Sequence, residues 1–298
     1  MQIHNVQQRT DEWHALRKAH GTASQAACIM GCSPWMPRTW RELVEVKNGV
    51  RESPVLPHMR AGSEDEPIIQ NHYELETDQL GNDLVVSDGV MLASLDWTPI
   101  LDDPFDPITK IAEFKRPFKG TESDLWKMAQ KGGCPDHYYA QIQHQLAVTG
   151  ALSCDLVVYA HDIDFIHIVE IPPDYDYQEE LRSKWAEFWR YYGTGKMPPA
   201  QDRDIIDVDD IDLIDFTTEW KEVSDKLDVL KNREKELRGW ITGFADEGSI
   251  QCNGVVVERI VRSGTIDWKE LVDDQQLDDS LVERFRKKPT VYHRLRAA

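Results

Sequence analysis

The strongest structural signal in this chain lies in residues 111–115, which read Ile-Ala-Glu-Phe-Lys. Side chains on a β-strand alternate between its two faces, and this segment has that alternation. Glu113 and Lys115 therefore share one face, while Phe114 points to the other face and into a core. The pattern predicts a strand that carries an acid and a lysine side by side.

A second acid, Asp96, comes shortly before this strand. Residues 84–94 are strand-like around a turn at 87–89, so they predict a hairpin whose second arm ends at Asp96. Two carboxylates with an adjacent lysine suit metal-dependent phosphodiester hydrolysis, because carboxylates hold Mg²⁺ and a lysine can act on the attacking water. The alternatives are a solvated ion pair for Glu113 and Lys115 and a turn aspartate for Asp96.

Length and composition limit the class of protein. The chain has 298 residues, of which 41% are hydrophobic, enough for one large domain or one domain with an extension. It contains no run of 18 apolar residues, and its polar start lacks a signal peptide, so we expect a cytoplasmic protein without a membrane span. The five cysteines are odd in number and scattered, and we interpret them as reduced thiols.

The formal net charge of −19 disfavours nonspecific binding of nucleic acid over the whole surface. It does not exclude a local basic channel, because acids can face solvent elsewhere and a metal site itself needs carboxylates. Any contact with nucleic acid is therefore expected to be confined to such a channel.

Helical periodicity and capping residues divide much of the sequence into helices. The expected helices cover residues 11–20, 24–31, 40–47, 62–73, 121–131, 136–149 and 179–192, and two further strands cover 155–160 and 165–171. We expect a compact domain over residues 1–200, an acidic linker over 201–216 and a C-terminal extension over 217–298. The extension is expected to hold a long charged helix over 217–245 and a small α/β segment.

Two polar residues on these helices have both a structural and a functional interpretation. Glu66 follows Ser63 by three residues, which fits a capping box at a helix start, but a first-turn glutamate can also point into a cleft. Gln141 shares the polar face of the helix at 136–149 with Gln145. The default interpretation of that face is exposure to solvent.

Arg17 and Ser24 lie on either side of Gly21 and together can form an anion site. A serine at a helix start offers free backbone N–H groups and the positive end of the helix dipole, and an arginine adds bidentate recognition of phosphate. The alternative is a capping serine and an unrelated surface arginine.

Taken in order, six short motifs resemble a known family. They are Trp13-x-x-x-Arg17, Gly21-Thr-Ala-Ser24, Gly62-x-x-x-Glu66, Ser94-Leu-Asp96, Glu113-Phe-Lys115-Arg-Pro-Phe and Tyr139-Ala-Gln141-Ile-Gln143. Over residues 10–200 the chain resembles the phage lambda exonuclease family, or YqaJ-type viral recombinases, of the PD-(D/E)XK nuclease superfamily. The resemblance implies an α/β fold, with a central mixed β-sheet flanked by helices, followed here by a C-terminal α+β extension.

The resemblance also implies a metal site. Asp96, Glu113 and the backbone carbonyl of Phe114 would bind Mg²⁺, with Mn²⁺ as a substitute. Glu66 would help to bind the metal or its water. Lys115 would orient and activate the attacking water.

Further roles follow from the same resemblance. Gln141 would support the site. Arg17, Ser24 and Ser94 would bind a 5′-phosphate, and Lys119 is a candidate for the basic residue that completes this pocket.

The implied activity is a 5′-to-3′ exonuclease on double-stranded DNA that leaves 3′ single-stranded overhangs for phage-type recombination by strand annealing. Met59 would be an apolar wedge that separates the strands. The implied partners are 5′-phosphorylated DNA ends, a single-strand annealing protein and two further copies in a homotrimeric ring, in a bacterial host cell that carries the phage or prophage. Two alternatives stay open: an endonuclease of the same fold, and a non-catalytic scaffold that binds DNA ends.

The chain departs from the family pattern in two places. The stretch between Asp96 and Glu113 is long and contains TPILDDPFDP, so we expect an enlarged loop there. The extension reaches beyond the resemblance, and its role stays open between subunit contacts, guidance of DNA and docking of a partner.

Overall fold

The structure is a computed structural model that leaves undescribed residues 52–56, 102, 104–105, 206–207, 246–247 and 259–298, and the side chains of 57–59. The chain divides into two compact units, Met1–Ile205 and Ile206–Ala298. Within the described residues, none of the helices has the length and hydrophobicity that a membrane span requires. All five cysteines lie in the described part, and each is a free thiol.

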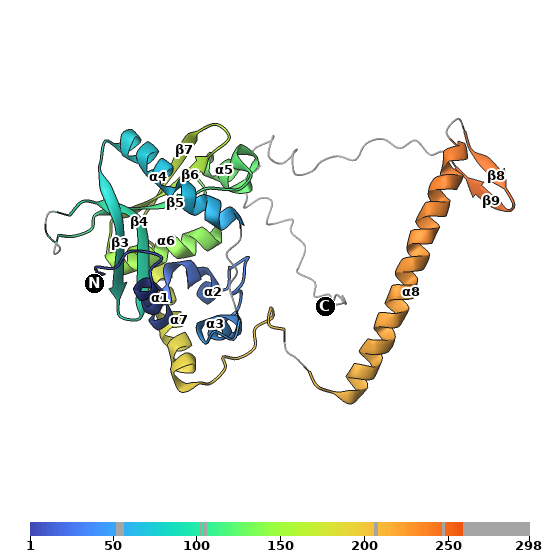
Figure 1. The fold of residues 1–298 in the computed structure, drawn as a ribbon, viewed down its shortest axis with the longest axis horizontal. Helices are drawn as coiled ribbons and strands as arrows, with labels where there is room; N and C mark the ends of the chain where they lie inside the picture. The colour runs from blue at the N-terminus through green and yellow to red at the C-terminus, as the bar shows by residue number, and fades with distance from the viewer. Residues whose placement is uncertain (52–56, 102, 104–105, 206–207, 246–247, 259–298) are drawn as a thin grey trace. The chain divides into compact units, whose positions relative to one another are not determined.

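The first unit is built on one mixed sheet with the strand order β1-β3-β4-β5-β6-β7, and β2 pairs with β4 beside this path (Figure 1). The strands are β1 (Gln2–His4), β2 (Gly21–Thr22), β3 (Gly81–Asp88), β4 (Met91–Pro99), β5 (Lys110–Lys115), β6 (Ser153–Ala160) and β7 (Phe165–Ile171). The predicted architecture, a central mixed sheet flanked by helices, is confirmed.

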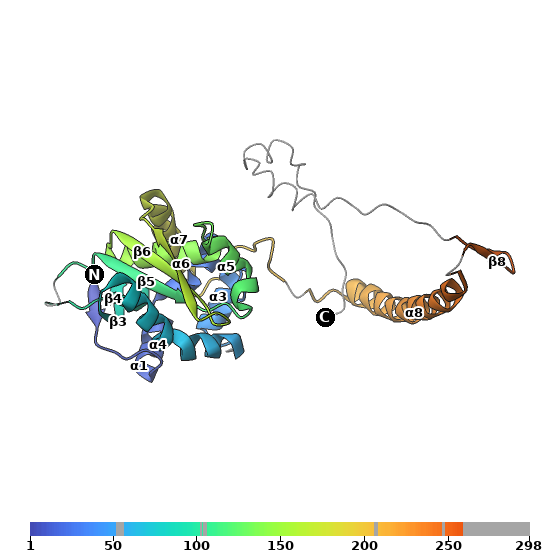
Figure 2. The ribbon, with the colours of Figure 1, turned by 90° about the horizontal axis from the view of Figure 1, so that it is seen from above.

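The helices of this unit cover both faces of the sheet. They are α1 (Asp11–Ala19), η1 (Ala23–Gln25), α2 (Ala26–Met30), α3 (Trp40–Lys47), α4 (Pro57–Thr77), η2 (Gly120–Glu122), α5 (Asp124–Ala129), α6 (Asp136–Thr149) and α7 (Tyr175–Thr194). Figures 1 and 2 show α4 and α7 on opposite sides of the strands. The sheet therefore lies between two hydrophobic cores.

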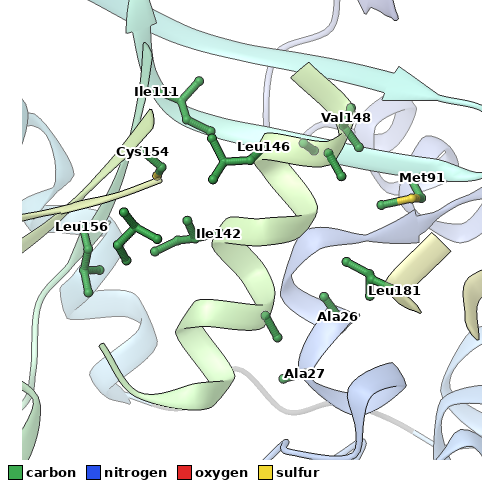
Figure 3. Close-up of a cluster of buried hydrophobic side chains, with 14 of the residues drawn as sticks. Ala26, Ala27, Met91, Ile111, Ile142, Leu146, Val148, Cys154, Leu156 and Leu181 are labelled. Carbon is green, nitrogen blue, oxygen red and sulfur yellow. The ribbon is translucent and has the colours of Figure 1, made fainter. Parts of the chain in front are cut away.

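The larger core packs α6 against the sheet on one side and against α2 and α7 on the other. Ile142 and Leu146 of α6 contact this core together with Ile111 of β5 and Leu156 of β6 (Figure 3). The smaller core lies under α4 and contains Phe114. Phe114 thus points away from the α6 side, as the alternation along its strand predicts.

Strand pairing fixes the neighbours of β5. It runs antiparallel to β4, with Trp97 opposite Ala112, and parallel to β6, with Lys115 opposite Val158. A parallel pair needs a crossover connection, and here α5 and α6 supply it. Helix α6 is consequently placed against the face of β5 that carries Glu113.

Three sequence expectations about local structure are corrected. Helix α4 begins at Pro57, so Ser63 lies inside the helix and forms no capping box with Glu66. The residue that caps η1 is Thr22, whose side chain and Gln25 form the capping box there. Strand β4 continues to Pro99, so Asp96 lies within the strand and not at its end.

Helix α6 also differs from the expectation of a solvated polar face. Gln143, His144 and Gln145 are buried, because the helix is covered by the sheet and by α7. His144 lies between the carbonyl of Leu92 (3.2 Å) and the indole N–H of Trp185, which donates to its Nδ1 (3.2 Å). Burial lowers the pKa of His144 to about 3, so it is neutral in this core.

The second unit contains the long charged helix that the sequence predicts. Helix α8 spans Ile211–Thr242, capped by Asp210, and is followed by η3 (Gly243–Ala245) and a hairpin of β8 (Ile250–Cys252) and β9 (Val255–Val257). The predicted linker 201–216 thus includes the first turns of α8. Residues 201–205 of that predicted linker belong to the first unit, where the Gln201 side chain accepts the Trp40 N–H (3.1 Å). The predicted elements after residue 258 lie outside the described residues.

The contact between Gly21 and Trp185 gives a test of the packing. A Cβ at Gly21 would lie 2.6 Å from ring carbons of Trp185, which is fully buried and cannot move aside. We expect Gly21→Ala to lower the free energy of unfolding by about 1–3 kcal/mol, measured by urea denaturation. The matched control is Gly62→Ala in α4, where a Cβ meets nothing within 4 Å, so stability should stay equal or rise. Equal stability of the two variants would contradict the packing.

Candidate active site

Two carboxylates and a lysine come together where β4 and β5 pair. The backbone N–H of Phe114 donates to Asp96 Oδ2 (2.8 Å), which places the Asp96 carboxylate directly beside β5. Glu113 is only 2% exposed, and one of its oxygens forms an ion pair with the Lys115 ammonium. The structure therefore brings Asp96, Glu113 and Lys115 into one cluster, as the sequence predicts.

Helix α6 holds Glu113 through two glutamines one turn apart. Gln141 Nε2 donates to Glu113 Oε1 (2.6 Å), and Gln145 Nε2 donates to Glu113 Oε2. Gln141 lies where the resemblance places it, beside the predicted metal site, but the role of Gln145 was not predicted. Its signal was the i, i+4 spacing from Gln141, which puts both amides on one helix face.

The two acids and the lysine strongly affect one another. Burial, and then the nearby charge of Glu113, raise the pKa of Asp96 well above its ordinary value. Burial alone would lower the pKa of Lys115, but Glu113 and Asp96 outweigh this and raise it. Lys115 is therefore an ammonium in this arrangement, able to donate hydrogen bonds and to orient a water.

Glu66 faces the cluster from α4, but it has a partner of its own. Its carboxylate accepts two hydrogen bonds from Arg9 Nη2, at 2.9 and 2.7 Å, and it contributes to the raised pKa of Asp96. Arg9 was not predicted, and no pattern in the sequence singles it out. A second pair, Asp65 with Arg116 (2.8 Å), joins α4 to the end of β5.

The predicted phosphate-binding residues also assemble, around the ring of Trp13. Arg17 Nη2 donates to Ser24 Oγ (3.1 Å), and its guanidinium lies 4.4 Å from the centroid of Trp13. The indole N–H of Trp13 donates to Ser94 Oγ (2.8 Å). Ser94 and Asp96 are two residues apart on β4, so they share one face of the strand. Burial lowers the pKa of Arg17 to about 10, which leaves it a cation at neutral pH.

Two further predicted residues are not brought into these clusters. Lys119 is exposed at the start of η2, and its side chain has no hydrogen bond or ion pair with the described residues. Met59 lies in α4, but its side chain is outside the described part of the structure. The roles of both stay predictions.

The donor set suits a divalent cation that keeps part of its water shell. No group of three or more His, Cys, Asp or Glu side chains within the described residues could enclose a metal. Asp96 and Glu113 alone supply two carboxylates, and Mg²⁺ is commonly bound through one or two carboxylates with several waters. Burial is the main reason that the pKa of Asp96 is raised, and the negative charge of Glu113 raises it further; a cation would relieve this second effect.

Comparison with known proteins agrees with this geometry. Residues 12–152 match the family of YqaJ-like viral recombinase domains. Residues 12–152 are therefore similar to a YqaJ-like viral recombinase domain. No curated protein matches the sequence.

Two solved structures share the fold of this YqaJ-like domain. One is an alkaline exonuclease, LHK-Exo, from Laribacter hongkongensis, with 24% identity and a TM-score of 0.51 over 62% of this chain and 94% of that chain. The other is LHK-Exo in complex with dAMP, with 23% identity, a TM-score of 0.51 and the same coverage. The likeness shows that this chain and LHK-Exo share one fold. Family and fold together support a phage-type nuclease.

One buried lysine holds the helix that carries Arg17. Lys47 Nζ donates to the backbone carbonyls of Arg17 (3.2 Å) and His20 (2.6 Å) at the end of α1. The residue is 4% exposed. Burial, with a smaller effect of the Arg17 charge, lowers the pKa of Lys47 to about 8.

This lowered pKa predicts how stability changes with pH. In the unfolded chain Lys47 titrates near 10.5. Between pH 8 and 10.5 the unfolded chain binds more protons than the folded one, so Lys47 adds stability as the pH rises. The gain is on the order of 3 kcal/mol at the upper end. Urea unfolding of the wild type and of Lys47→Met should therefore diverge through this window. Parallel curves would contradict the burial of a charged Lys47.

Proposed function

We propose that the protein is a Mg²⁺-dependent 5′-to-3′ exonuclease that digests double-stranded DNA from its ends and leaves 3′ single-stranded overhangs. The observation that carries the proposal is the common placement of two clusters on β4. Ser94 belongs to the Arg17–Ser24 cluster, and Asp96 belongs to the Glu113–Lys115 cluster. The residues that we propose to bind phosphate are thus neighbours of the acid–lysine cluster on one strand, which supports the proposal.

In this proposal each residue of the acid–lysine cluster has a distinct task. Asp96, Glu113 and the Phe114 carbonyl would hold Mg²⁺, which supplies charge neutralisation at the scissile phosphate and a more acidic bound water. Lys115 orients the water through its ammonium. Gln141 and Gln145 of α6 each donate a hydrogen bond to Glu113, and together they keep its carboxylate in one orientation.

The polarity of digestion would come from the Trp13-centred cluster. Arg17 can recognise a terminal phosphate as a bidentate donor, and the hydroxyls of Ser24 and Ser94 add neutral hydrogen bonds. Two residues of a strand span roughly 7 Å, about the rise of two stacked nucleotides. If a 5′-phosphate binds near Ser94, a phosphodiester of the same strand, close to that end, therefore lies near Asp96.

We extend the proposal to the assembly. A homotrimeric ring with a basic lining would reconcile the net charge of −19 with binding of DNA, and a single-strand annealing protein would receive the 3′ strand. The resemblance to phage recombinases supports both partners. Light scattering on the purified chain gives the mass of the assembly directly.

The first test removes the lysine. Lys115→Ala should reduce digestion of linear duplex DNA in Mg²⁺ by about 100-fold or more, because the attacking water loses its positioning group. The matched control, Lys127→Ala, replaces an exposed lysine of α5 and should digest like the wild type. Chelation of the metal should abolish digestion, and Mg²⁺ or Mn²⁺ should restore it.

Other outcomes of the same assay would point elsewhere. Cleavage of a covalently closed plasmid would indicate an endonuclease. Binding of DNA ends without metal-dependent turnover would indicate a scaffold. Undiminished digestion by a folded Lys115→Ala variant would contradict the proposed site.

The second test concerns the 5′ end. Wild-type protein should prefer 5′-phosphorylated ends over 5′-hydroxyl ends, and Arg17→Ala should reduce this preference about 10- to 100-fold, because a charge-assisted contact with phosphate is lost. The control is Lys18→Ala, the exposed neighbour on α1. Strand-specific labels give the rate for each end. An unchanged preference for 5′-phosphorylated ends in Arg17→Ala would contradict the proposal that Arg17 binds the 5′-phosphate.

A further inference from the structure

Three neighbouring aromatic rings, one of which lies over Lys115, have no part in the chemistry described above. Trp35 lies in the loop between α2 and α3, and His137 and Tyr138 begin α6. The ring centroid of Trp35 is 4.7 Å from that of His137, edge to face, and 6.2 Å from that of Tyr138. The three rings, Trp35, His137 and Tyr138, form an aromatic platform.

The platform is connected to the acid–lysine cluster. Lys115 Nζ lies 5.2 Å from the centroid of the Tyr138 ring, which is within the range of a cation–π contact. Tyr138 is also three residues before Gln141, on the same helix that holds Glu113. The position of the platform relative to the reacting atoms is therefore set by α6.

Trp35 is exposed although its backbone is held in place. The residue is 54% exposed, so most of its side chain is not used in packing. Its carbonyl accepts a hydrogen bond from Ser33 Oγ (2.7 Å), and the carbonyl of Ser33 accepts one from Arg203 (2.9 Å). A large ring on a fixed loop is suited to contact a ligand with little loss of conformational entropy.

We propose that the platform stacks against an unpaired nucleobase of the DNA end, next to the phosphate that reacts at Lys115. The proposal rests on the nuclease function above, because it places the substrate at the acid–lysine cluster. Bases are the flat, apolar parts of DNA, and aromatic side chains bind them regardless of sequence. Such contacts also suit a chain with a net charge of −19, whose overall electrostatics oppose DNA.

The experiment compares three replacements of Trp35. Base–aromatic stacking is lost on alanine substitution, so Trp35→Ala should raise KM for linear duplex DNA about 5- to 100-fold. The kcat should stay near the wild-type value, because the acids and Lys115 are untouched. Trp35→Phe keeps a flat ring and should restore most of the affinity, whereas Trp35→Leu keeps apolar volume without a π-face and should not.

A direct readout separates stacking from other contacts. We expect 2-aminopurine at the 5′-terminal position of the duplex, bound in Ca²⁺ to prevent turnover, to be quenched by the wild type and less by Trp35→Ala. The control is Tyr175→Ala, which removes a ring of 73% exposure from α7 and should leave KM and quenching unchanged. Thermal unfolding of Trp35→Ala should match the wild type, because the side chain is exposed.

These measurements distinguish a failure of the aromatic platform from a failure of the nuclease function. An unchanged KM and unchanged quenching in Trp35→Ala would overturn the platform while leaving the nuclease function intact. Full activity of Trp35→Leu would also overturn it, since apolar contact would then suffice. If the wild type digests no DNA, the nuclease proposal fails, and the 2-aminopurine measurement still decides whether Trp35 stacks on a base.

Discussion

Glu113 is a carboxylate inside a protein interior, and the first unit is arranged to give it partners. A buried and unpaired carboxylate costs several kcal/mol, so each of its oxygens needs a donor. Lys115 comes from the same strand, and Gln141 and Gln145 come from the crossover helix. The parallel pairing of β5 and β6 is what places that helix over the carboxylate.

The same arrangement explains why the pKa values of Asp96 and Lys115 are raised. Asp96 is held against β5 by a backbone N–H, and its pKa is raised first by burial and then by the nearby carboxylate of Glu113. The negative charges of Glu113 and Asp96 raise the pKa of Lys115, so its ammonium holds its proton more tightly. Asp96, Glu113 and Lys115 are charged groups that a protein core normally excludes. Here their mutual interactions and the pairing of β4 with β5 hold them together, and such clusters are typical of functional sites.

The sequence predicted what depends on local periodicity. Glu113 and Lys115 share a face because a strand has period two, and Phe114 accordingly fills the other core. The grouping of Ser94 with Arg17 and Ser24, which depends on distant segments, was found only through the resemblance. The contacts of Gln145 and Arg9 were missed. The capping box at Ser63 was wrong because α4 begins six residues earlier, and local spacing does not reveal where a helix starts.

The pairing of the N-terminus with the hairpin has a consequence for synthesis of the chain. Strand β1 pairs with β3, so that His4 bonds Ser87 at a separation of 83 residues, and Trp13 reaches Ser94 across 81 residues. Contacts of such long range form late and slow the folding of a domain. During synthesis on a ribosome, the N-terminal segment cannot form its native contacts until β3 and β4 have been made. Glu113 obtains its glutamine partners only after α6 has been made. The nascent chain therefore cannot assemble the Trp13-centred cluster until about a third of it has been made, or the acid–lysine cluster until about half of it has been made.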